Sequence, residues 1–198
     1  MGRKSKSDER KPEILQNLYE VLSKEGLEGT TLSKVADHMG VNSGLLVHYF
    51  KTKEEMILAM VDFMLDKYAN IYIAKLNEYS DPQDRLNNVL NTFFEPDWTK
   101  RGDASVFWSC FSLSFRNERV KERFEKMYDG FRNVLADEIA MYIDAGIVHV
   151  KDPVKTADII ITLIEGLNFN RSVREEDKVL AETALFFKQS VSLLLANG

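Results

Sequence analysis

The side chains that most often carry out catalysis are few in this sequence, and they are not spaced for it. The chain has 198 residues, with three histidines and one cysteine. His38, His48 and His149 are not spaced as metal ligands. Cys110 lies in a stretch without a histidine, so no nucleophile and base are paired in the sequence. We therefore expect no metal, no cofactor and no enzymatic activity, and a single cysteine excludes a disulfide framework.

The side chains of residues 31–50 follow a different pattern, which is that of two short helices joined by a tight turn. Two short amphipathic helices are expected at residues 31–39 and 43–49, the second capped by Asn42. Gly40 lies between them, and glycine readily takes the positive φ that an abrupt turn requires. The pattern predicts a helix-turn-helix. Short helices paired around a glycine also occur as plain packing, which is the alternative interpretation.

The elements expected to hold this segment in place are helices throughout. Apolar residues recur with the helical period, and no strand alternation or repeat is present. Helix starts are marked by the capping-box spacing of Thr52 and Glu55, and by aspartate followed by proline at Asp81 and Asp152. The expected helices cover residues 12–26, 31–39, 43–49, 52–79, 82–94, 104–115, 118–145, 153–169 and 175–196. The fold class is therefore all-α, with about nine helices.

The helix lengths predict where the chain divides, because the first three helices are short and the others are mostly long. We expect a basic, disordered tail at residues 1–11 and a three-helix domain containing the helix-turn-helix at residues 12–52. A six-helix C-terminal domain is expected at residues 53–198.

The composition is that of a globular protein in a reducing compartment. Hydrophobic residues make up 44% and charged residues 29% of the chain, which excludes disordered and collagen-like classes. No apolar run approaches the roughly 18 residues of a membrane span, and the N-terminus lacks the apolar stretch of a signal peptide. We expect a cytoplasmic protein without a membrane partner.

The net charge of −5 conceals a basic N-terminus. Residues 1–11 carry five basic and two acidic side chains, and an acidic protein can bind nucleic acid when its basic groups are gathered in one place. Arg3, Lys4 and Lys6 are therefore candidate DNA contacts. The alternative is a solvated tail without a partner.

The sequence of residues 31–50, TLSKVADHMGVNSGLLVHYF, and the KTKEEM that follows it resemble the DNA-binding region of the TetR family of bacterial transcriptional regulators. The match covers about a quarter of the chain and departs from the family pattern at Met39, at Asn42 for serine and at Val47 for tyrosine. In having valine in place of tyrosine at position 47, the sequence is similar to the choline-responsive, BetI-like branch of the family. The matching residues are Thr31, Val35, Ala36, Gly40, Val41, Gly44, Leu46, Tyr49, Phe50, Lys53 and Glu54.

The resemblance implies DNA contacts in and around the second helix. Phosphate contacts are implied for Thr31 and Lys53, and base or phosphate contacts at the start of the helix. Gly44 points to a close approach of the backbone to DNA, because glycine inside a helix costs ~1 kcal/mol relative to alanine. The candidate DNA-binding residues are Thr31, Asn42, Ser43, Gly44, Leu45, His48, Tyr49 and Lys53.

Most of these positions have a plainer alternative. Thr31 and Asn42 could be helix caps only, and Tyr49 could be half-buried packing. His48 and Lys53 could be ordinary exposed side chains.

The recognition helix carries no arginine, so two-point contact with guanine is not expected. Asn42 could contact adenine, and Leu45 could contact the methyl group of thymine. We expect modest direct reading of bases, with phosphate contacts and DNA shape supplying more of the affinity.

Aromatic side chains are crowded into residues 93–131, where there are 10 in 39 residues. A packed core is one interpretation, and a pocket for an apolar or cationic ligand is the other. The resemblance implies an effector site among these middle helices, in which Trp98, Trp108 and Tyr128 could enclose a quaternary ammonium group. The candidate pocket residues are Phe94, Trp98, Phe107, Trp108, Phe111, Tyr128, Phe131 and Glu165.

Residues 157–167 are apolar nearly all round, which near the C-terminus suggests a surface for a partner, and the last expected helix carries an apolar stripe as well. The resemblance implies that two subunits pair these helices in a four-helix bundle. Glu165 could be a pocket carboxylate, an acceptor at the dimer interface or a partly exposed residue. The candidate interface residues are Ile160, Ile164, Leu167, Leu180, Ala184, Phe187 and Val191.

Together the residues and the resemblance imply a homodimeric transcriptional regulator, acting as a repressor. A small-molecule effector of unidentified chemistry would release it from a palindromic operator. The alternatives are a small helical enzyme, or a helical adaptor that binds protein and not DNA.

Overall fold

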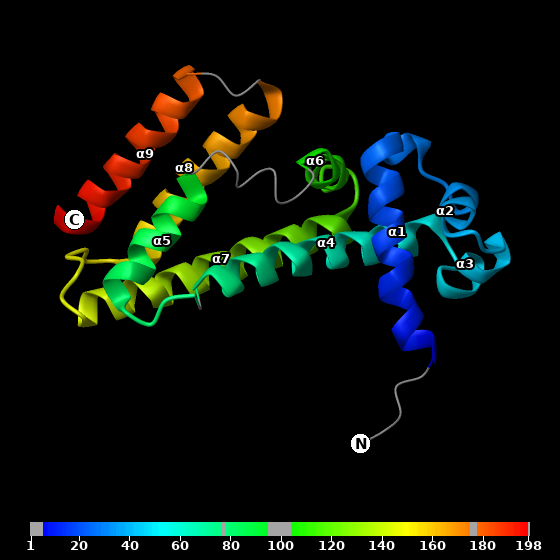
Figure 1. The fold of residues 1–198 in the computed structure, drawn as a ribbon, viewed down its shortest axis with the longest axis horizontal. Helices are drawn as coiled ribbons and strands as arrows, with labels where there is room; N and C mark the ends of the chain where they lie inside the picture. Colours follow the sequence, from blue (N-terminus) through cyan, green and yellow to red (C-terminus); the bar gives the residue numbers. More distant parts are fainter. Residues whose placement is uncertain (1–5, 77, 95–103, 175–177, 198) are drawn as a thin grey trace. The chain divides into compact units, whose positions relative to one another are not determined.

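The computed structural model describes residues 6–76, 78–94, 104–174 and 178–197, and every regular element in these ranges is an α-helix (Figure 1). The all-α fold is therefore confirmed, with nine helices in the described residues. They are α1 (Lys6–Gly29), α2 (Leu32–Met39), α3 (Ser43–Tyr49), α4 (Lys53–Leu76), α5 (Pro82–Phe94), α6 (Ala104–Leu113), α7 (Glu118–Asp144), α8 (Pro153–Val173) and α9 (Lys178–Asn197).

Side-chain caps fix several of the helix starts, as the sequence predicts. The Thr52 hydroxyl accepts a hydrogen bond from the Glu55 N–H at 3.1 Å. The Asp81 carboxylate accepts from the N–H groups of residues 83 and 84 at 2.9 and 3.0 Å, and Asp152 accepts from Lys155 N–H at 3.0 Å. Each cap satisfies N–H groups that the first turn of a helix leaves without a partner.

Helix α1 differs from the expectation at its start. It begins at Lys6 and not at Pro12, so residues 6–11, which we expected to be disordered, are helical. These residues are mostly lysine, glutamate and arginine, which have high helix propensity. Pro12, inside the helix, lacks the N–H of one backbone bond without ending it. The expected end is confirmed, because Gly26 has φ of 70° and interrupts the helical backbone.

The described chain forms two compact units. The first contains α1, α2, α3, α4 as far as Lys67, α6, and α7 as far as Glu125. Within it α1 packs against α2 and α6, and α2 packs against α3 (Figure 1). Its most deeply buried side chains include Ile14, Leu18, Val35, Leu46, Phe50, Met64, Val106 and Val120.

The second unit contains the rest of α4 and α7 together with α5, α8 and α9. Helix α9 packs against both α5 and α8, and Figure 1 shows α8 and α9 side by side. An ion pair braces this unit, because the Arg85 Nε lies 2.7 Å from a Glu138 carboxylate oxygen that also accepts from the Tyr142 hydroxyl at 2.8 Å. Its core includes Leu90, Phe93, Phe94, Leu135, Ile139, Tyr142, Ala157 and Leu195.

The structure corrects the residues proposed for the dimer interface. Phe187 is partly buried against the core of the second unit, and the others are no more than 6% exposed within this single chain. The spacing of apolar residues along α8 and α9 identifies a face of each helix, but that face packs inside the unit and not against a second subunit. The core residues concerned are Ile160, Ile164, Leu167, Leu180, Ala184 and Val191.

Among the described residues, α9 alone is long and apolar enough to cross a membrane by length and composition, with a mean hydropathy of 1.4 in its most apolar window. A segment of this kind was not expected from the sequence, because no uninterrupted apolar run approaches the length of a membrane span. The exposed side chains responsible for it are described below.

Candidate nucleic-acid interface

The turn between α2 and α3 has the geometry that Gly40 predicts. Gly40 has φ of 65° and ψ of 32°, the left-handed conformation that glycine adopts without steric cost. The N–H of Val41 then donates to the carbonyl of Ala36 at 3.0 Å, which closes the end of α2. The chain can therefore leave α2 abruptly and enter α3 two residues later.

Helix α3 has one buried row of side chains and an outward face. Residues four apart share a face of a helix. Leu46 is buried and Phe50, four residues on, is buried as well, whereas Leu45 and Tyr49 are half-buried. Two adjacent rows are exposed, one formed by Ser43 and Val47 and the other by Gly44 and His48. These four residues are called the outward face of α3.

Asn42 caps α3. Its side-chain oxygen accepts a hydrogen bond from Gly44 N–H at 2.8 Å. Two-point contact with adenine needs both the oxygen and the amino group of an asparagine. The cap already uses one acceptor position of that oxygen, so the cap alone accounts for Asn42, and contact with adenine stays a prediction.

The same cap supplies a structural reason for Gly44, which the sequence did not. A Cβ at this position would lie 3.0 Å from the Asn42 side-chain oxygen, closer than ordinary packing allows. Gly44 therefore keeps room for the cap, and its exposure leaves the backbone of α3 accessible as well.

Thr31 caps α2, and its hydroxyl accepts from Lys34 N–H at 3.2 Å. Lys34 is a basic residue of this region that the sequence analysis did not select. Its ammonium lies 2.6 Å from the Glu25 carboxylate, and this hydrogen bond lowers the pKa of Glu25. Both side chains are about half exposed, so the pair is open to competition from a phosphate.

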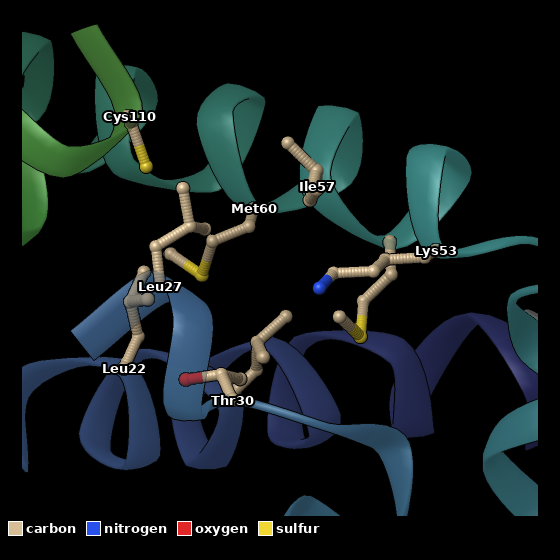
Figure 2. A pocket seen from close by; sticks show the side chains of 9 residues that line it. Leu22, Leu27, Thr30, Lys53, Ile57, Met60 and Cys110 are labelled. Carbon is tan, nitrogen blue, oxygen red and sulfur yellow. The ribbon is translucent and has the colours of Figure 1, made fainter. Parts of the chain in front are cut away.

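Lys53 is exposed at the start of α4, and its stem lines a small cavity in the first unit (Figure 2). The cavity has about 10 Å³ of space, which is room for about one water molecule and for no organic ligand. Thr30, Met60 and Cys110 are among its other lining residues. Cys110 is 1% exposed, and burial raises the pKa of its thiol to about 12, which keeps it protonated and unreactive.

Ion pairs join the beginning of α4 to the beginning of α7 within the first unit. The Asp62 carboxylate accepts from Arg123 Nε at 2.7 Å. The Glu54 carboxylate lies 3.3 Å from the Asn117 amide nitrogen and 3.4 Å from the Arg119 guanidinium. The sequence does not predict these contacts, because the partners are more than sixty residues apart and their spacing carries no signal.

The candidate pocket residues fall in both units, except Trp98, which lies outside the described residues. In the first unit, Phe107 and Phe111 have ring centroids 6.3 Å apart, and the rings of both meet Trp108 edge to face. Phe124 also packs on Phe107 and Phe111, with centroids 5.6 and 5.3 Å away. In this unit the aromatic side chains form a cluster with one another.

In the second unit, Phe94 is 4% exposed and Phe131 packs against the core. The side chains of Tyr128 on α7 and Glu165 on α8 lie close enough together for each to shift the pKa of the other. Burial raises the pKa of Glu165, and the Tyr128 side chain opposes that rise. Burial, and then the charge of Glu165, raises the pKa of the Tyr128 hydroxyl.

The outer faces of α8 and α9 carry apolar side chains that the core does not use. On α9, Val179, Phe186 and Leu193 are 60, 64 and 65% exposed and lie seven residues apart. On α8, Ile159 and Val173 are 48 and 62% exposed, and Gly166 lies midway between them with open space where a Cβ would be. Residues seven apart form a stripe along a helix, so each helix has an apolar stripe on its outer face.

Comparison with known proteins covers nearly the whole chain. Residues 14–60 match the family model for bacterial regulatory proteins of the tetR family. Residues 81–196 match the model for the tetracyclin repressor-like C-terminal domain. The HTH-type regulator YfiR of Bacillus subtilis is 26% identical over 95% of this chain and 94% of its own length.

Two further proteins are similar to this chain over most of its length. The regulator BetI of Rhizobium meliloti is 22% identical over 96% of this chain and 91% of its own length. A transcriptional regulator from Saccharomonospora viridis, solved in complex with choline, superimposes with a TM-score of 0.78 at 16% identity, over 93% of this chain and 96% of that one. The second likeness concerns the fold.

Proposed function

The chain belongs to the TetR family of bacterial transcriptional regulators, and we propose that it is a homodimeric repressor which a small molecule releases from a palindromic operator. The observation that carries this proposal is the outward face of α3. Ser43, Gly44, Val47 and His48 have no part in the core, and they lie on the second helix of a helix-turn-helix, the helix that enters the major groove in such motifs.

Several side chains around α3 are suited to contact the DNA backbone. Thr31 and Lys53 lie at the starts of α2 and α4, and Tyr49 is half-buried with its ring edge-to-face against His48. We assign these residues to phosphate contacts, which orient a protein on DNA. Arg3 and Lys4, outside the described residues, and Lys6, the first residue of α1, are proposed as further backbone contacts.

The second subunit is proposed to cover the apolar stripes of α8 and α9. Large exposed apolar surfaces are rare on monomers and mark interaction sites. The open space at Gly166 would let a partner helix approach α8 closely. Such a dimer would present two α3 helices to successive major grooves, ~34–36 Å apart.

The effector is proposed to bind in the second unit near Tyr128 and Glu165. A carboxylate that burial has made harder to ionise is a common mark of a functional site. BetI relatives and the choline complex of the S. viridis protein support a cationic effector. Isothermal titration with choline should release or absorb heat with the unchanged chain, and much less with Glu165→Gln. No heat with choline or other ammonium compounds would rule out the cationic class.

The switch is proposed to act through α4, which is separated from α3 by three residues and continues from the first unit into the second. Effector binding would favour a state in which the two α3 helices no longer fit both half-sites. A coupling of ~1–3 kcal/mol would suffice. As regulators of bacterial genes act on DNA in the cytoplasm, we propose that location for this chain.

DNA binding is tested by fluorescence anisotropy with duplexes from the DNA flanking the gene of this protein. Ser43→Asp adds a negative charge to the outward face of α3 and should weaken binding at least tenfold. Ser112→Asp makes the same change on an exposed position of α6 and should bind as the unchanged chain does. If no duplex binds even at low salt, the proposal fails, and a protein-binding adaptor becomes the better account.

A further inference from the structure

Val47 is an exposed apolar side chain on the helix expected to enter the DNA. It is 52% exposed, whereas Leu46 beside it is fully buried and Leu45 is half-buried. Val47 is therefore not part of the core of the first unit. Its side chain is free to contact a partner from the exposed side of the helix that enters the major groove in such motifs.

The other outward side chains of α3 limit how this face can distinguish bases. Arginine, lysine, asparagine and glutamine make the two-point contacts with guanine and adenine, and the outward face has none of them. The nearest asparagine, Asn42, has its oxygen in the helix cap at 2.8 Å from the Gly44 nitrogen. The base feature that remains for an apolar side chain is the C5-methyl group of thymine, which projects into the major groove.

We propose that Val47 determines operator specificity by packing against the methyl group of a thymine in each half-site. The proposal rests on the DNA-binding function and names the contact that reads the sequence. It moves the thymine contact from Leu45, which the sequence analysis chose, because Leu45 and Tyr49 form the half-buried row of α3 whereas Val47 is in an exposed row.

Ser43 lies four residues before Val47, in the same exposed row. Its hydroxyl can bond to any base edge or to a phosphate and so adds little discrimination. Gly44, in the neighbouring row, has no side chain that would project beside Val47. On the side toward the start of α3, Val47 is therefore flanked by the small residues Ser43 and Gly44, which leaves room for a thymine methyl there.

The test removes the C5-methyl group of single thymines from the DNA and leaves the rest of the duplex unchanged. A duplex is first selected from a randomised pool by the unchanged chain. Each thymine of its half-sites is then replaced singly by deoxyuridine, which keeps the base pair but lacks the C5-methyl. One thymine per half-site should be sensitive, with binding about fourfold weaker per lost methyl, the value expected for one buried apolar carbon.

The same series with Val47→Ala assigns the contact. This variant should bind the thymine and deoxyuridine duplexes equally at the sensitive position, and Val47→Ile should keep the preference for thymine. Ser43→Ala is the matched control, because it alters the neighbouring exposed side chain and should retain the thymine preference whatever its overall affinity.

Each outcome decides the question. A selected duplex without a sensitive thymine would overturn the assignment, and so would a preference that Val47→Ala retains in full. In both cases DNA binding itself would stand. If no duplex can be selected at low salt, the DNA-binding function fails and the Val47 assignment fails with it.

Discussion

Asn42 stabilises the start of α3 with its side-chain oxygen, and this contact decides what the residue can do for DNA. The oxygen accepts from Gly44 N–H at 2.8 Å, and a Cβ on Gly44 would lie 3.0 Å from the same oxygen. Asn42 and Gly44 therefore form the helix cap together. The resemblance to a known motif predicted that both matter, but not that they serve each other.

Asn42→Ala should lower the free energy of unfolding by about 1 kcal/mol, because alanine cannot cap the helix. Asn42→Asp should keep the stability, since aspartate caps equally well, but should weaken DNA binding by adding a negative charge near the phosphates. Urea unfolding and anisotropy titrations measure the two effects. Equal stability of the alanine variant and the unchanged chain would show that the cap contributes nothing.

The thiol of Cys110 should make stability depend on pH in alkaline solution. Its pKa is raised from 9.0 to about 12 by burial, so the unfolded chain ionises first as the pH rises. The contribution of this group to stability is full below about pH 9 and should be lost progressively between about pH 9 and 12. Cys110→Ala should show a smaller fall in this window than the unchanged chain in urea unfolding at each pH. Parallel curves would contradict the raised pKa.

At the scale of the elements, the sequence predicts the helices better than their faces. Pro82 and Pro153 begin α5 and α8 as expected, because a capping aspartate followed by proline is a local signal. The buried face of α8 was misjudged, since both of its sides are apolar. Ile160 packs in the core and Ile159, one residue earlier, is 48% exposed. Only the tertiary packing distinguishes the two.

The turn before α3 depends on the backbone of Gly40. Gly40→Ala should destabilise the protein by about 1 kcal/mol, because alanine at φ of 65° is strained. Gly130 is the matched control, as it lies inside α7 without a positive φ and with open space for a Cβ. Gly130→Ala should be stabilising by about 0.5–1 kcal/mol. Thermal unfolding compares the two, and equal effects would contradict the role of Gly40.

At the scale of the whole molecule, the proposed function needs two copies of α3 at a fixed spacing, so the dimer we propose through the apolar stripes of α8 and α9 is as necessary to it as the helix-turn-helix. The sequence does not reveal these stripes by apolar content alone, because the core residues of the same helices are equally apolar. They become evident once the core residues have been identified by their burial.

The double variant Phe186→Glu, Leu193→Glu should convert the proposed dimer into a monomer. Each subunit would bury two negative charges at the interface, without a partner of opposite charge. Ile73→Glu makes the same kind of change at a 46% exposed position of α4 and should remain dimeric. Sedimentation equilibrium gives the masses. A double variant that stays dimeric would place the interface elsewhere.

The most direct test of the central claim is a hydroxyl-radical footprint of the unchanged chain on a selected duplex. The account predicts two protected regions related by a two-fold axis, with centres ~34–36 Å apart along the helix. Protection of the same bonds should be lost with Ser43→Asp and kept with Ser112→Asp. A single protected region, or uniform protection that Ser43→Asp leaves unchanged, would contradict it.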